Sequence, residues 1–505
     1  MENDITQKPQ DYKAIIPKTI KDNLDLLVPV KEVNGESQTY IYLKPIWEKE
    51  KAIAKYLYDR REHKDVKGDC NDEDIIKAEE DLRRLTGKSL ILDDSQKEAV
   101  KSAFNHKITV ITGSGGTGKS TICRCIYYLA HEKGLSVRMM SPTGKAAQVL
   151  SDKTKGHAAT IHRSLKMMPG EDYGREDIKE DIVIVDEFSM VGLDTLFAVL
   201  NALEENLWCN IVFVGDSNQL PSVSPGNFLS DIVEADCANV VMLEQIHRQD
   251  ENSYISLIAN DIAESKRVEE IPAEASDIKW IDINPNTFAD RMPDVIKKYM
   301  KKRDINDLQI MAPMYRGDCG VNKINEEIQK MMAELNGTQD KYLKKHFKLF
   351  HVGDRVIQTK NNYDKQIFNG DMGIVVDLGR KVLDPSKSDQ KEDFIVVNFY
   401  GDDITFFGDD EISNLQLAWC ITVHKYQGSQ SPYIIFVMAG EAHNMMSKEL
   451  VYTAFTRAEK FLCIYGNIKM LRKAPHESVV KKRYTNMVNI VKEMRENRKI
   501  LQVME

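Results

Sequence analysis

The sequence VITGSGGTGKST, residues 110–121, begins as a β-branched run, breaks into glycines and ends in lysine, serine and threonine. From Gly113 to Ser120 it fits the pattern G-x-x-x-x-G-K-[S/T]. In such a loop successive backbone N–H groups point at phosphate oxygens, and the N-terminus of the following helix adds a partial positive charge. Lys119 would reach the β and γ phosphates, and Ser120 would bind Mg²⁺. The stretch therefore predicts a nucleoside triphosphate site made of Gly113, Ser114, Gly115, Gly116, Thr117, Gly118, Lys119, Ser120 and Thr121.

Short apolar runs, most of them β-branched, lie on both sides of this loop and are separated by helix-length segments. Buried strands that alternate with helices are typical of a parallel sheet covered on both faces. The expected fold class is therefore α/β, with two parallel-sheet domains in tandem. The first set of runs is ITVITG (108–113), SVRMMS (136–141), DIVIVD (181–186), NIVFVG (210–215) and NVVML (239–243); the second is LQIMAP (308–313), YIIFVMAG (433–440) and FLCIYG (461–466).

These patterns divide the chain into five parts. Residues 346–414 carry strand-like runs between turn residues, which indicate a small antiparallel barrel inserted into the second domain. Residues 1–88 are mixed, with a helical stretch over 47–58. In 476–505, Val480, Tyr484, Met487, Val488 and Val491 fall at helical spacing, which predicts a final helix that docks on the body or binds a partner. The two α/β domains then cover 89–247 and 248–345 with 415–475.

The composition is that of an ordinary globular protein of 505 residues, with 42% hydrophobic and 29% charged residues. No apolar stretch approaches the roughly 20 residues that span a bilayer, and the first residues lack a secretory apolar core, so we expect a cytoplasmic protein. The eight cysteines have no zinc-ligand spacing and are expected to be reduced core residues. The net charge of −9 argues against a general nucleic-acid coat but permits a local basic groove.

Three polar residues at the ends of predicted strands point to catalysis on a bound triphosphate. Asp186 follows the run IVIV and can hold the metal ion through water, while Glu187 can orient and deprotonate the attacking water. Gln219, in FVGDSNQLPSV, can detect the loss of a γ-phosphate and pass that change to a mobile neighbour.

Later segments supply positive charge and hydrogen-bond donors. Arg248 in LEQIHRQ and Arg457 in VYTAFTRAEK are candidates that the second domain could bring to the γ-phosphate, where arginine offsets transition-state charge. The stretch AWCITVHKYQGSQ, 418–430, crowds Thr422, His424, Lys425, one tyrosine and one glutamine at a predicted strand-to-helix junction. Such a cluster suits phosphate contacts and base stacking.

Taken in order, these blocks resemble the superfamily 1 helicases, and within them the RecD-like group. LDDSQKEAV is similar to the Q motif of that family, GSGGTGKST to Walker A, SPTGKAAQVL to motif Ia, VDEFSM to Walker B and GDSNQLPSV to motif III. LEQIHRQ is similar to motif IV, APMYRGDCGV to the proline-tyrosine-arginine-glycine block, ITVHKYQGSQ to motif V and VYTAFTRAEK to motif VI. The resemblance covers residues 90–465 almost continuously.

The resemblance implies an ATP- and Mg²⁺-dependent motor that moves 5′ to 3′ on single-stranded DNA and separates duplex at junctions. It further implies two RecA-like domains, an inserted Src-homology-3-like barrel, a monomeric motor, adenine contact by Gln96 and a hairpin pin at 166–180, where Tyr173 is the one aromatic wedge candidate. Residues placed on the DNA strand by the resemblance are Ser141, Thr143, Thr160, His162, Asn361, Asn362, Thr422, His424 and Lys425.

Two features depart from the family pattern, and other functions stay open. Motif V of the family has a small residue where Tyr426 stands and an acid where Gln430 stands, so no role is transferred to Gln430. Residues 166–180 can equally form a plain surface loop. An RNA helicase of the same superfamily is an alternative, because backbone contacts do not reveal a reader of the 2′-OH. A subunit that uses ATP as a switch without unwinding is another.

Overall fold

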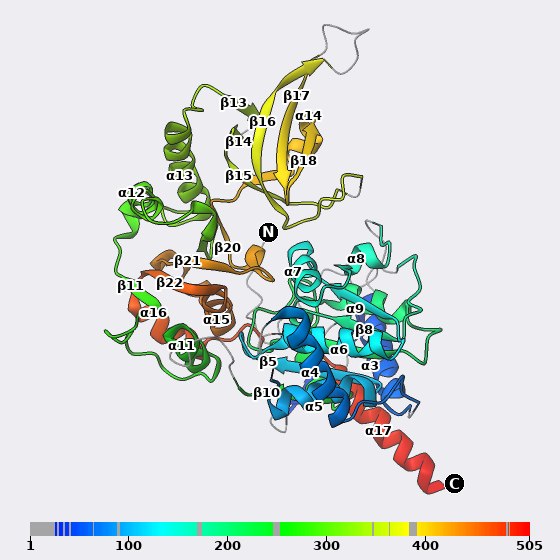
Figure 1. The fold of residues 1–505 in the computed structure, drawn as a ribbon. Helices are drawn as coiled ribbons and strands as arrows, with labels where there is room; N and C mark the ends of the chain where they lie inside the picture. The colour runs from blue at the N-terminus through cyan, green and yellow to red at the C-terminus, as the bar shows by residue number, and fades with distance from the viewer. Residues whose placement is uncertain are drawn as a thin grey trace.

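The computed structural model describes residues 26–27, 30–33, 36–39, 42–63, 65–87, 91–168, 174–245, 253–345, 348–362, 364–382, 391–480, 483 and 485–504. Two α/β domains lie beside each other, and an antiparallel sheet stands above them (Figure 1). The expected fold class of two tandem parallel-sheet domains with a small inserted β domain is therefore confirmed.

The first domain is built on a six-stranded sheet whose neighbouring strands all pair in parallel. In its central strand β9 (Asn210–Gly215), Ile211 and Phe213 join one apolar core and Val212 and Val214 join the other, because successive side chains point to opposite faces. In sheet order the remaining strands are β10 (Asn239–Leu243) and β5 (Ile108–Gly113) on one side of β9, and β8 (Ile182–Val185), β6 (Val137–Ser141) and β7 (Ala158–Thr160) on the other.

Helices cover both faces of this sheet. One core is shared with α4 (Asp72–Thr86), α5 (Asp94–Asn105), α6 (Lys119–Glu132) and α7 (Gly144–Thr154). The other is shared with α3 (Lys44–Arg61), α8 (Ile161–Ser164), α9 (Leu193–Asn201), α10 (Phe228–Glu234) and α17 (Met487–Met504). The five strands that the first set of runs predicts are confirmed; β7 was not expected.

The second domain has a five-stranded parallel sheet in the order β11 (Ile278–Ile281), β22 (Ala458–Gly466), β21 (Ser431–Met438), β12 (Leu308–Ala312) and β20 (Cys420–Thr422). Two apolar cores again flank it. Its helices are α11 (Tyr254–Ala263), α15 (Lys448–Thr456) and α16 (Ile468–Lys473) on one face, and α12 (Phe288–Met300) and α13 (Val321–Asn336) on the other. Single 3₁₀ turns connect several of these elements.

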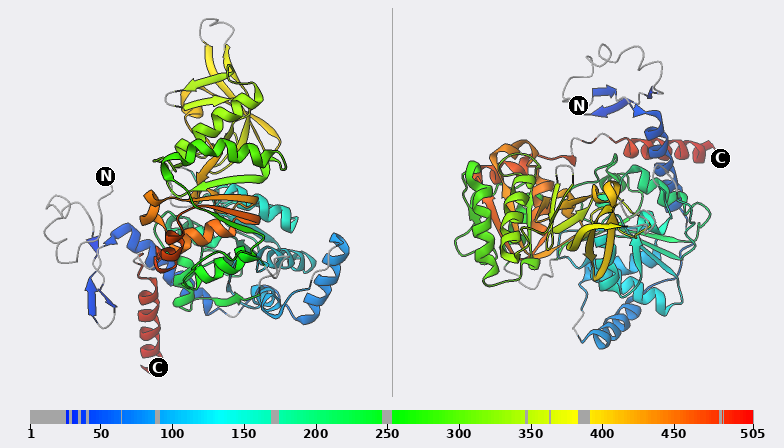
Figure 2. Two further views of the ribbon diagram at one scale, coloured as in Figure 1. Left: turned by 90° about the vertical axis from the view of Figure 1, so that its left-hand side faces the viewer. Right: turned by 90° about the horizontal axis from the view of Figure 1, so that it is seen from above.

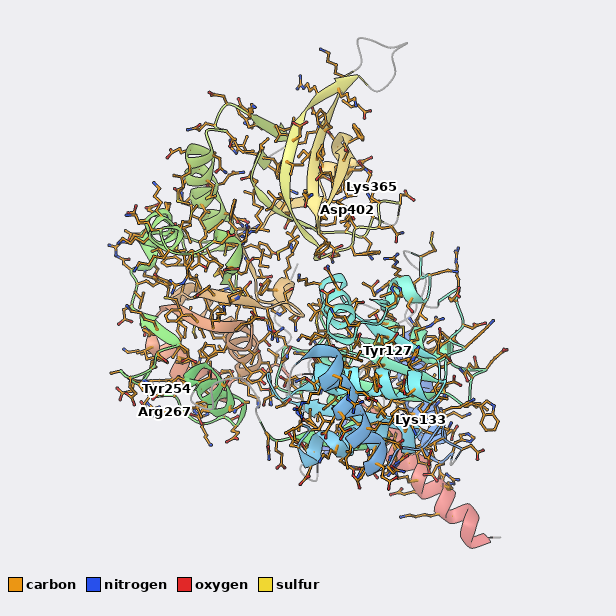
Figure 3. The ribbon with its side chains drawn as sticks, viewed as in Figure 1. Tyr127, Lys133, Tyr254, Arg267, Lys365 and Asp402 are labelled. Carbon is orange, nitrogen blue, oxygen red and sulfur yellow. The ribbon has the colours of Figure 1, made fainter. Side chains whose placement is uncertain are left out.

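The inserted β domain has its own apolar core, to which Phe350, Val397 and Phe406 contribute. Its antiparallel sheet extends to β19, and a separate hairpin packs on β16, so the insertion reaches beyond the expected 346–414 on both sides. Lys365, labelled in Figure 3, lies 5.2 Å from the centre of the Phe406 ring and pairs with Glu411. The elements are β13 (Tyr342–Lys345), β14 (Lys348–His351), β15 (Arg355–Gln358), β16 (Met372–Val382), β17 (Lys391–Phe399), β18 (Asp402–Phe407), α14 (Gly408–Ile412) and β19 (Leu415–Leu417).

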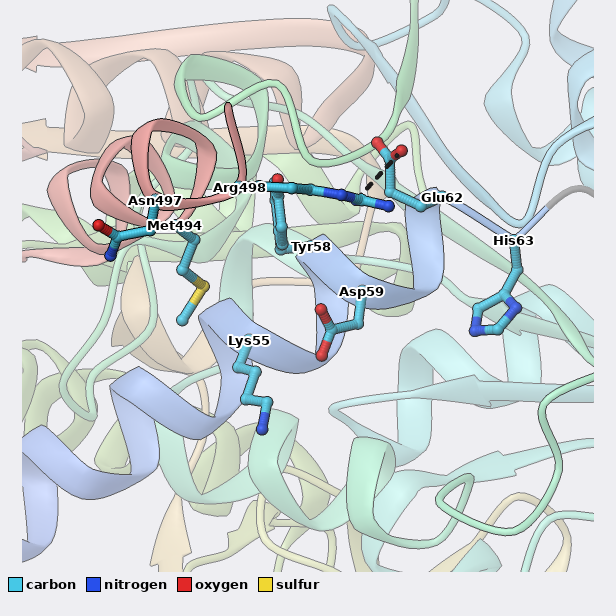
Figure 4. A pocket seen from close by; sticks show the side chains of 8 residues that line it. All are labelled: Lys55, Tyr58, Asp59, Glu62, His63, Met494, Asn497 and Arg498. Carbon is cyan, nitrogen blue, oxygen red and sulfur yellow. Dashed lines mark ion pairs between the residues drawn. The ribbon is translucent and has the colours of Figure 1, made fainter. Parts of the chain in front are cut away.

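The two ends of the described chain meet on the first domain. Short strands β1 (Leu26–Leu27), β2 (Val30–Val33), β3 (Glu36–Thr39) and β4 (Tyr42–Leu43) precede α3, and α17 lies close to this N-terminal part (Figure 2). The apolar side of α17, with Met487, Ile490 and Val491, is buried against α3 and α10, so the predicted docking on the body is confirmed. Beyond this contact a hollow of 580 Å³ separates the two helices, and Arg498 pairs with Glu62 across it at 3.3 Å (Figure 4).

The C-terminal helix begins at Met487, seven residues after Val480, where the periodicity places its first apolar contact. The reason is a distant carboxylate. Glu50, buried in α3, accepts hydrogen bonds from the backbone N–H groups of Asn486 (2.7 Å) and Met487 (3.1 Å). A carboxylate at this point satisfies free N–H groups and complements the helix dipole.

We expect Glu50→Ala to lower the free energy of unfolding by about 1–3 kcal/mol, because two buried backbone donors lose a charged acceptor. Hydrogen exchange should speed up at the start of α17, and Glu50→Gln should restore part of the protection. Glu48→Ala, which removes an exposed carboxylate from the same helix, is the matched control. Equal stability of the Glu50→Ala and Glu48→Ala variants would contradict this role.

Candidate active site

The predicted phosphate loop connects β5 to α6 and depends on glycine. Gly116 and Gly118 have φ angles of 91° and 87°, in the left-handed region that side chains disfavour. A Cβ atom on Gly118 would lie 2.3 Å from Gln96 Nε2. The loop therefore turns tightly and presents its backbone at the N-terminus of α6, where anions bind.

Gln96, in α5, is hydrogen-bonded to the backbone of this loop. It is buried, its Nε2 donates to the Thr117 carbonyl (3.0 Å), and its Oε1 accepts from the Asp93 N–H (3.2 Å) as part of a capping box at the start of α5. Both ends of the amide are thus engaged by the protein. Contact with adenine, which the resemblance implies for Gln96, stays a prediction and would need an exchange of these bonds.

Lys119 and Ser120 form the first turn of α6. The Lys119 ammonium group donates to the carbonyls of Gly113 and Ser114, the latter at 2.9 Å. Lys153 from α7 donates to Ser120 Oγ at 3.3 Å. Two cations therefore stand at the mouth of the loop, and both are bonded to neutral oxygens that a phosphate group would replace with stronger, charged acceptors.

The acidic pair follows β8. Asp186 is half-buried at the cavity. Burial, together with the charge of Glu187, raises its pKa to about 6, while a hydrogen bond from the Glu187 N–H and the charges of Lys119 and Lys153 act in the opposite direction. Glu187 adopts a left-handed backbone (φ 53°), which costs a non-glycine residue energy and is enriched at functional sites. A divalent cation would complete the charge balance of a carboxylate in this position.

Asp216 and Gln219 follow β9 and are both buried. Asp216 accepts from the Asn218 N–H (3.0 Å) and from Gln219 Nε2 (3.3 Å). Among the residues that the structure describes, Gln219 Oε1 has no hydrogen-bond partner. A buried amide oxygen without a partner costs free energy, so a donor such as an attacking water would fit there.

Arg457 reaches the site from the second domain, at the end of α15. It is buried, and its guanidinium donates to the Thr453 carbonyl (3.3 Å), the Ser429 carbonyl (3.2 Å) and Thr456 Oγ1 (3.4 Å). These bonds are long and their acceptors neutral. Arg248, the second predicted arginine, lies outside the described residues.

A cavity of 900 Å³ between the two domains brings these groups together. The predicted residues that line it are Gly115, Gly116, Gly118, Lys119, Ser120, Thr121, Asp186, Glu187, Gln219 and Arg457. Gln430, to which the sequence analysis transferred no role, lines it as well, and so do four residues that the sequence reasoning missed, Arg124, Lys145, Lys153 and Glu459. Cations, a glycine cradle and paired acids in one cavity fit a nucleoside triphosphate with a divalent metal ion. Gly113, Ser114 and Thr117 support the loop from outside the cavity lining.

The residues predicted to line a DNA strand come from all three structured parts. Thr143 caps α7 and Thr160 caps α8 through their hydroxyl groups, and Ser141 ends β6. Burial lowers the pKa of His162 and of His424, so both imidazoles are neutral donors near pH 7. Thr422 Oγ1 accepts from the Lys425 N–H (3.3 Å), and Asn361 and Asn362 accept from backbone N–H groups of their own loop before β16.

Some of these segments meet at the N-terminus of α7. A Cβ atom on Gly428 would lie 2.9 Å from Thr143 Oγ1, and one on Gly144 would lie 2.6 Å from Asp371 Oδ1 of the inserted domain. The Lys145 ammonium group lies 5.5 Å from the ring centre of Tyr400, whose hydroxyl donates to Asp371. The first domain, the second domain and the insertion are therefore in contact at one point.

Two expectations for this region need correction or fall outside the structure. Tyr426 lies in a 3₁₀ turn rather than at a helix start, and it is buried, with its hydroxyl bonded to Ser431 Oγ, so its ring is not available for base stacking. In the candidate pin at 166–180, residues 169–173, including Tyr173, lie outside the described residues.

Other broad expectations can be compared directly with the described residues. All eight cysteines lie within the described residues, and seven of them are buried, which fits the expected core positions. No described helix combines the length and apolar character needed to cross a bilayer. Within the same residues, no group of three or more histidine, cysteine, aspartate or glutamate side chains forms a candidate metal site.

Comparison with known families and proteins gives consistent matches. Residues 91–282 match an AAA domain, 324–399 the SH3 domain of ATP-dependent RecD-like DNA helicases, and 417–465 the C-terminal domain of UvrD-like helicases. The chain is 32% identical over 371 residues to the ATP-dependent RecD2 DNA helicase of Deinococcus radiodurans, which covers 73% of this chain and 48% of the relative. It thus spans about half the length of that relative.

A second relative and one solved structure extend this comparison. The chain is 27% identical over 449 residues to the RecBCD enzyme subunit RecD of Mycolicibacterium smegmatis, covering 79% of this chain and 75% of that protein. Bacteroides Pif1 bound to single-stranded DNA aligns with a TM-score of 0.42 at 20% identity, covering 74% of this chain and 92% of that one. Because this TM-score and identity are low, the relationship rests on the sequence matches.

Proposed function

This chain belongs to the RecD-like helicases of superfamily 1, and from that premise we propose that it is an ATP-dependent DNA helicase that moves 5′ to 3′ on single-stranded DNA and separates duplex ahead of it. The observation that carries the proposal is the shared cavity, in which Lys119, Asp186 and Arg457 come from two different domains. A site split in this way couples nucleotide chemistry to the separation of the domains. DNA replication, recombination or repair is the proposed setting.

The chemistry supplied by ATP with Mg²⁺ is phosphoryl transfer to water. In our proposal, Lys119 and the loop N–H groups bind the phosphates, and Ser120 and Asp186 hold the metal ion. Glu187 accepts a proton from the attacking water, Gln219 orients that water through its free Oε1, and Arg457 offsets the charge that develops.

Domain motion then follows from bond exchange at the cavity. Arg457 leaves three neutral acceptors for a charged one, which draws the end of α15 toward the phosphate loop. The strand is proposed to lie where Thr143, Lys145, Gly428 and the insertion meet, so that closing and opening shift the contacts made by each domain. Neutral His162 and His424 suit hydrogen bonds to sugar and phosphate oxygens there.

The decisive experiment uses two partial duplexes that differ only in carrying a 5′ or a 3′ single-stranded tail. We expect ATP-driven strand separation of the 5′-tailed substrate alone. Unwinding from the 3′ tail alone would keep the helicase but reverse the proposed polarity. Hydrolysis that DNA stimulates without unwinding would leave a translocase, and turnover indifferent to nucleic acid would favour an ATP-switched subunit.

A second assay, which measures ATP turnover, distinguishes DNA from RNA as the substrate. We expect single-stranded DNA to stimulate ATP turnover at least about tenfold more than RNA of the same sequence, since the relatives that the chain matches are named as DNA helicases and contact at the 2′-OH position lets a protein tell RNA from DNA. Equal or stronger stimulation by RNA would support the RNA helicase alternative. A protein partner, if the helicase has one, is proposed to contact the N-terminal region or the exposed end of α17.

A further inference from the structure

Tyr452 connects the phosphate loop of the first domain with Asp216 of the same domain, although it belongs to the second. Its hydroxyl accepts a hydrogen bond from the Gly115 N–H (3.2 Å) and donates one to Asp216 Oδ2 (2.8 Å). Asp216 Oδ2 in turn accepts from Gln219 Nε2 (3.3 Å). Three hydrogen bonds thus join the loop to Gln219, which lines the cavity and whose buried Oε1 has no partner among the described residues.

The surroundings of Tyr452 hold this arrangement firmly. The side chain is 1% exposed, and burial together with the charge of Asp216 moves its pKa well above the ordinary value, so the hydroxyl stays protonated and remains a donor. One residue further along α15, Thr453 Oγ1 accepts from the Leu220 N–H (2.8 Å). Gln427 donates to the Leu220 carbonyl (2.9 Å), so the second domain holds the Asp216–Leu220 segment from two sides.

The Gly115 N–H has a second use. It belongs to the glycine loop whose N–H groups cradle phosphates, and Gly115 lines the nucleotide cavity. A charged phosphate oxygen is a stronger acceptor than a phenol hydroxyl. Space is also limited, because a Cβ atom on Gly115 would lie 3.2 Å from Thr456 Cβ and Cγ2 on the same helix as Tyr452. A terminal phosphate at Gly115 would therefore take the place of the Tyr452 hydroxyl.

We propose that Tyr452 is a positioning residue that reports the terminal phosphate of ATP to Gln219: phosphate replaces its hydroxyl at the Gly115 N–H, and the released helix α15 then shifts Asp216 and Gln219. The inference rests on the proposed function and adds a residue to it. ADP lacks the terminal phosphate, so it leaves the bond between Gly115 and Tyr452 in place.

The test is Tyr452→Phe, which removes only the hydroxyl. ATP no longer has to displace a hydrogen bond in this variant, so we expect the Kd for ATP to fall by about three- to tenfold, the range of one net hydrogen bond, while the Kd for ADP stays within about twofold of the wild-type value. DNA-stimulated kcat should fall by about tenfold or more, because Asp216 loses the hydrogen bond through which a shift of α15 reaches it and Gln219. Tighter ATP binding with slower turnover is not what a loss of packing produces.

Two further variants complete the design. Tyr128→Phe is the matched control, because the Tyr128 hydroxyl donates to Asp81 at 2.9 Å and neither residue lines the cavity, so it should change neither nucleotide affinity nor kcat. Asp216→Asn keeps the bond between Gly115 and Tyr452, so it should lower kcat while the ratio of ATP to ADP affinity stays within about twofold of wild type.

The outcomes separate this inference from the proposed function. If Tyr452→Phe changes ATP and ADP affinity equally, or matches Tyr128→Phe in all measurements, the positioning role is wrong even though the wild-type protein hydrolyses ATP. If the wild-type protein itself does not hydrolyse ATP with DNA present, the proposed function is wrong.

Discussion

Lys119→Ala is expected to lower DNA-stimulated ATP turnover by about 1,000-fold or more. The ammonium group donates to the carbonyls of Gly113 and Ser114 at the mouth of the phosphate loop. From there it can bind the β and γ phosphates and stabilise the negative charge that develops on them. Alanine removes this charge while the backbone N–H groups of the loop remain. Weak nucleotide binding should therefore persist, but without the cation that stabilises the transferring phosphoryl group.

The fold should survive the substitution. Lys119 contributes to the protein mainly through two bonds to carbonyls of its own loop, so we expect the free energy of unfolding to change by about 1 kcal/mol or less. Lys133→Ala is the control at the other end of α6; Lys133, labelled in Figure 3, pairs with Asp74 at 3.1 Å on the surface. If Lys119→Ala hydrolyses ATP as fast as Lys133→Ala, the assignment of this loop as the catalytic nucleotide site is wrong. Thermal unfolding of both variants checks the fold.

The sequence predicts the sheets well because buried parallel strands leave a local signal. In the run NIVFVG the four residues Ile211 to Val214 are all apolar, and both faces of β9 are indeed buried. Strands β7 and β11 were not expected: β7 has only three residues and the four of β11 include a lysine, so neither forms an apolar run, and each is a strand because a neighbouring strand pairs with it. Whether such a short segment becomes a strand thus depends on pairing partners distant in the chain and not on its local composition.

In the candidate active site, too, some features follow from local sequence and others depend on contacts between distant segments. The phosphate loop and the acidic pair depend on local spacing, and the structure brings them together with Gln219 and Arg457 in one cavity. Tyr452 lies five residues before Arg457 in a stretch that the sequence reasoning had singled out, but its meaning depends on Gly115 and Asp216, hundreds of residues away. The start of α17 likewise depends on Glu50 in α3. Contacts between elements distant in sequence have no local signal.

The DNA site was the least accessible from sequence. Polar residues such as Thr143 and Thr160 cap helices, and this structural use explains their presence without any ligand. Tyr426 was expected to offer an aromatic face and instead fills the core of the second domain. A position in a motif predicts which segment faces the strand, whereas burial decides which of its side chains are accessible.

Arg457→Ala is expected to lower kcat by about 1,000-fold, with a change in the KM for ATP of about threefold or less. The guanidinium is buried beside the cavity and bonded at 3.2–3.4 Å to neutral oxygens of Thr453, Ser429 and Thr456, so little energy is lost when it turns toward a phosphate. The charge it meets is greatest in the transition state. Removal of the side chain should therefore act on turnover far more than on binding.

Arg457→Lys tests whether charge alone is enough. A lysine keeps the positive charge but lacks the planar fork that spans two oxygens, and its shorter reach leaves the acceptors of the guanidinium unpaired. We expect it to recover less than about a tenth of the wild-type kcat. Arg472→Ala, which removes a partly exposed arginine of the second domain bonded to the Glu269 carbonyl, should retain wild-type turnover. A raised KM with unchanged kcat in Arg457→Ala would place the arginine in ground-state binding, and the second domain would then have no demonstrated part in the chemical step.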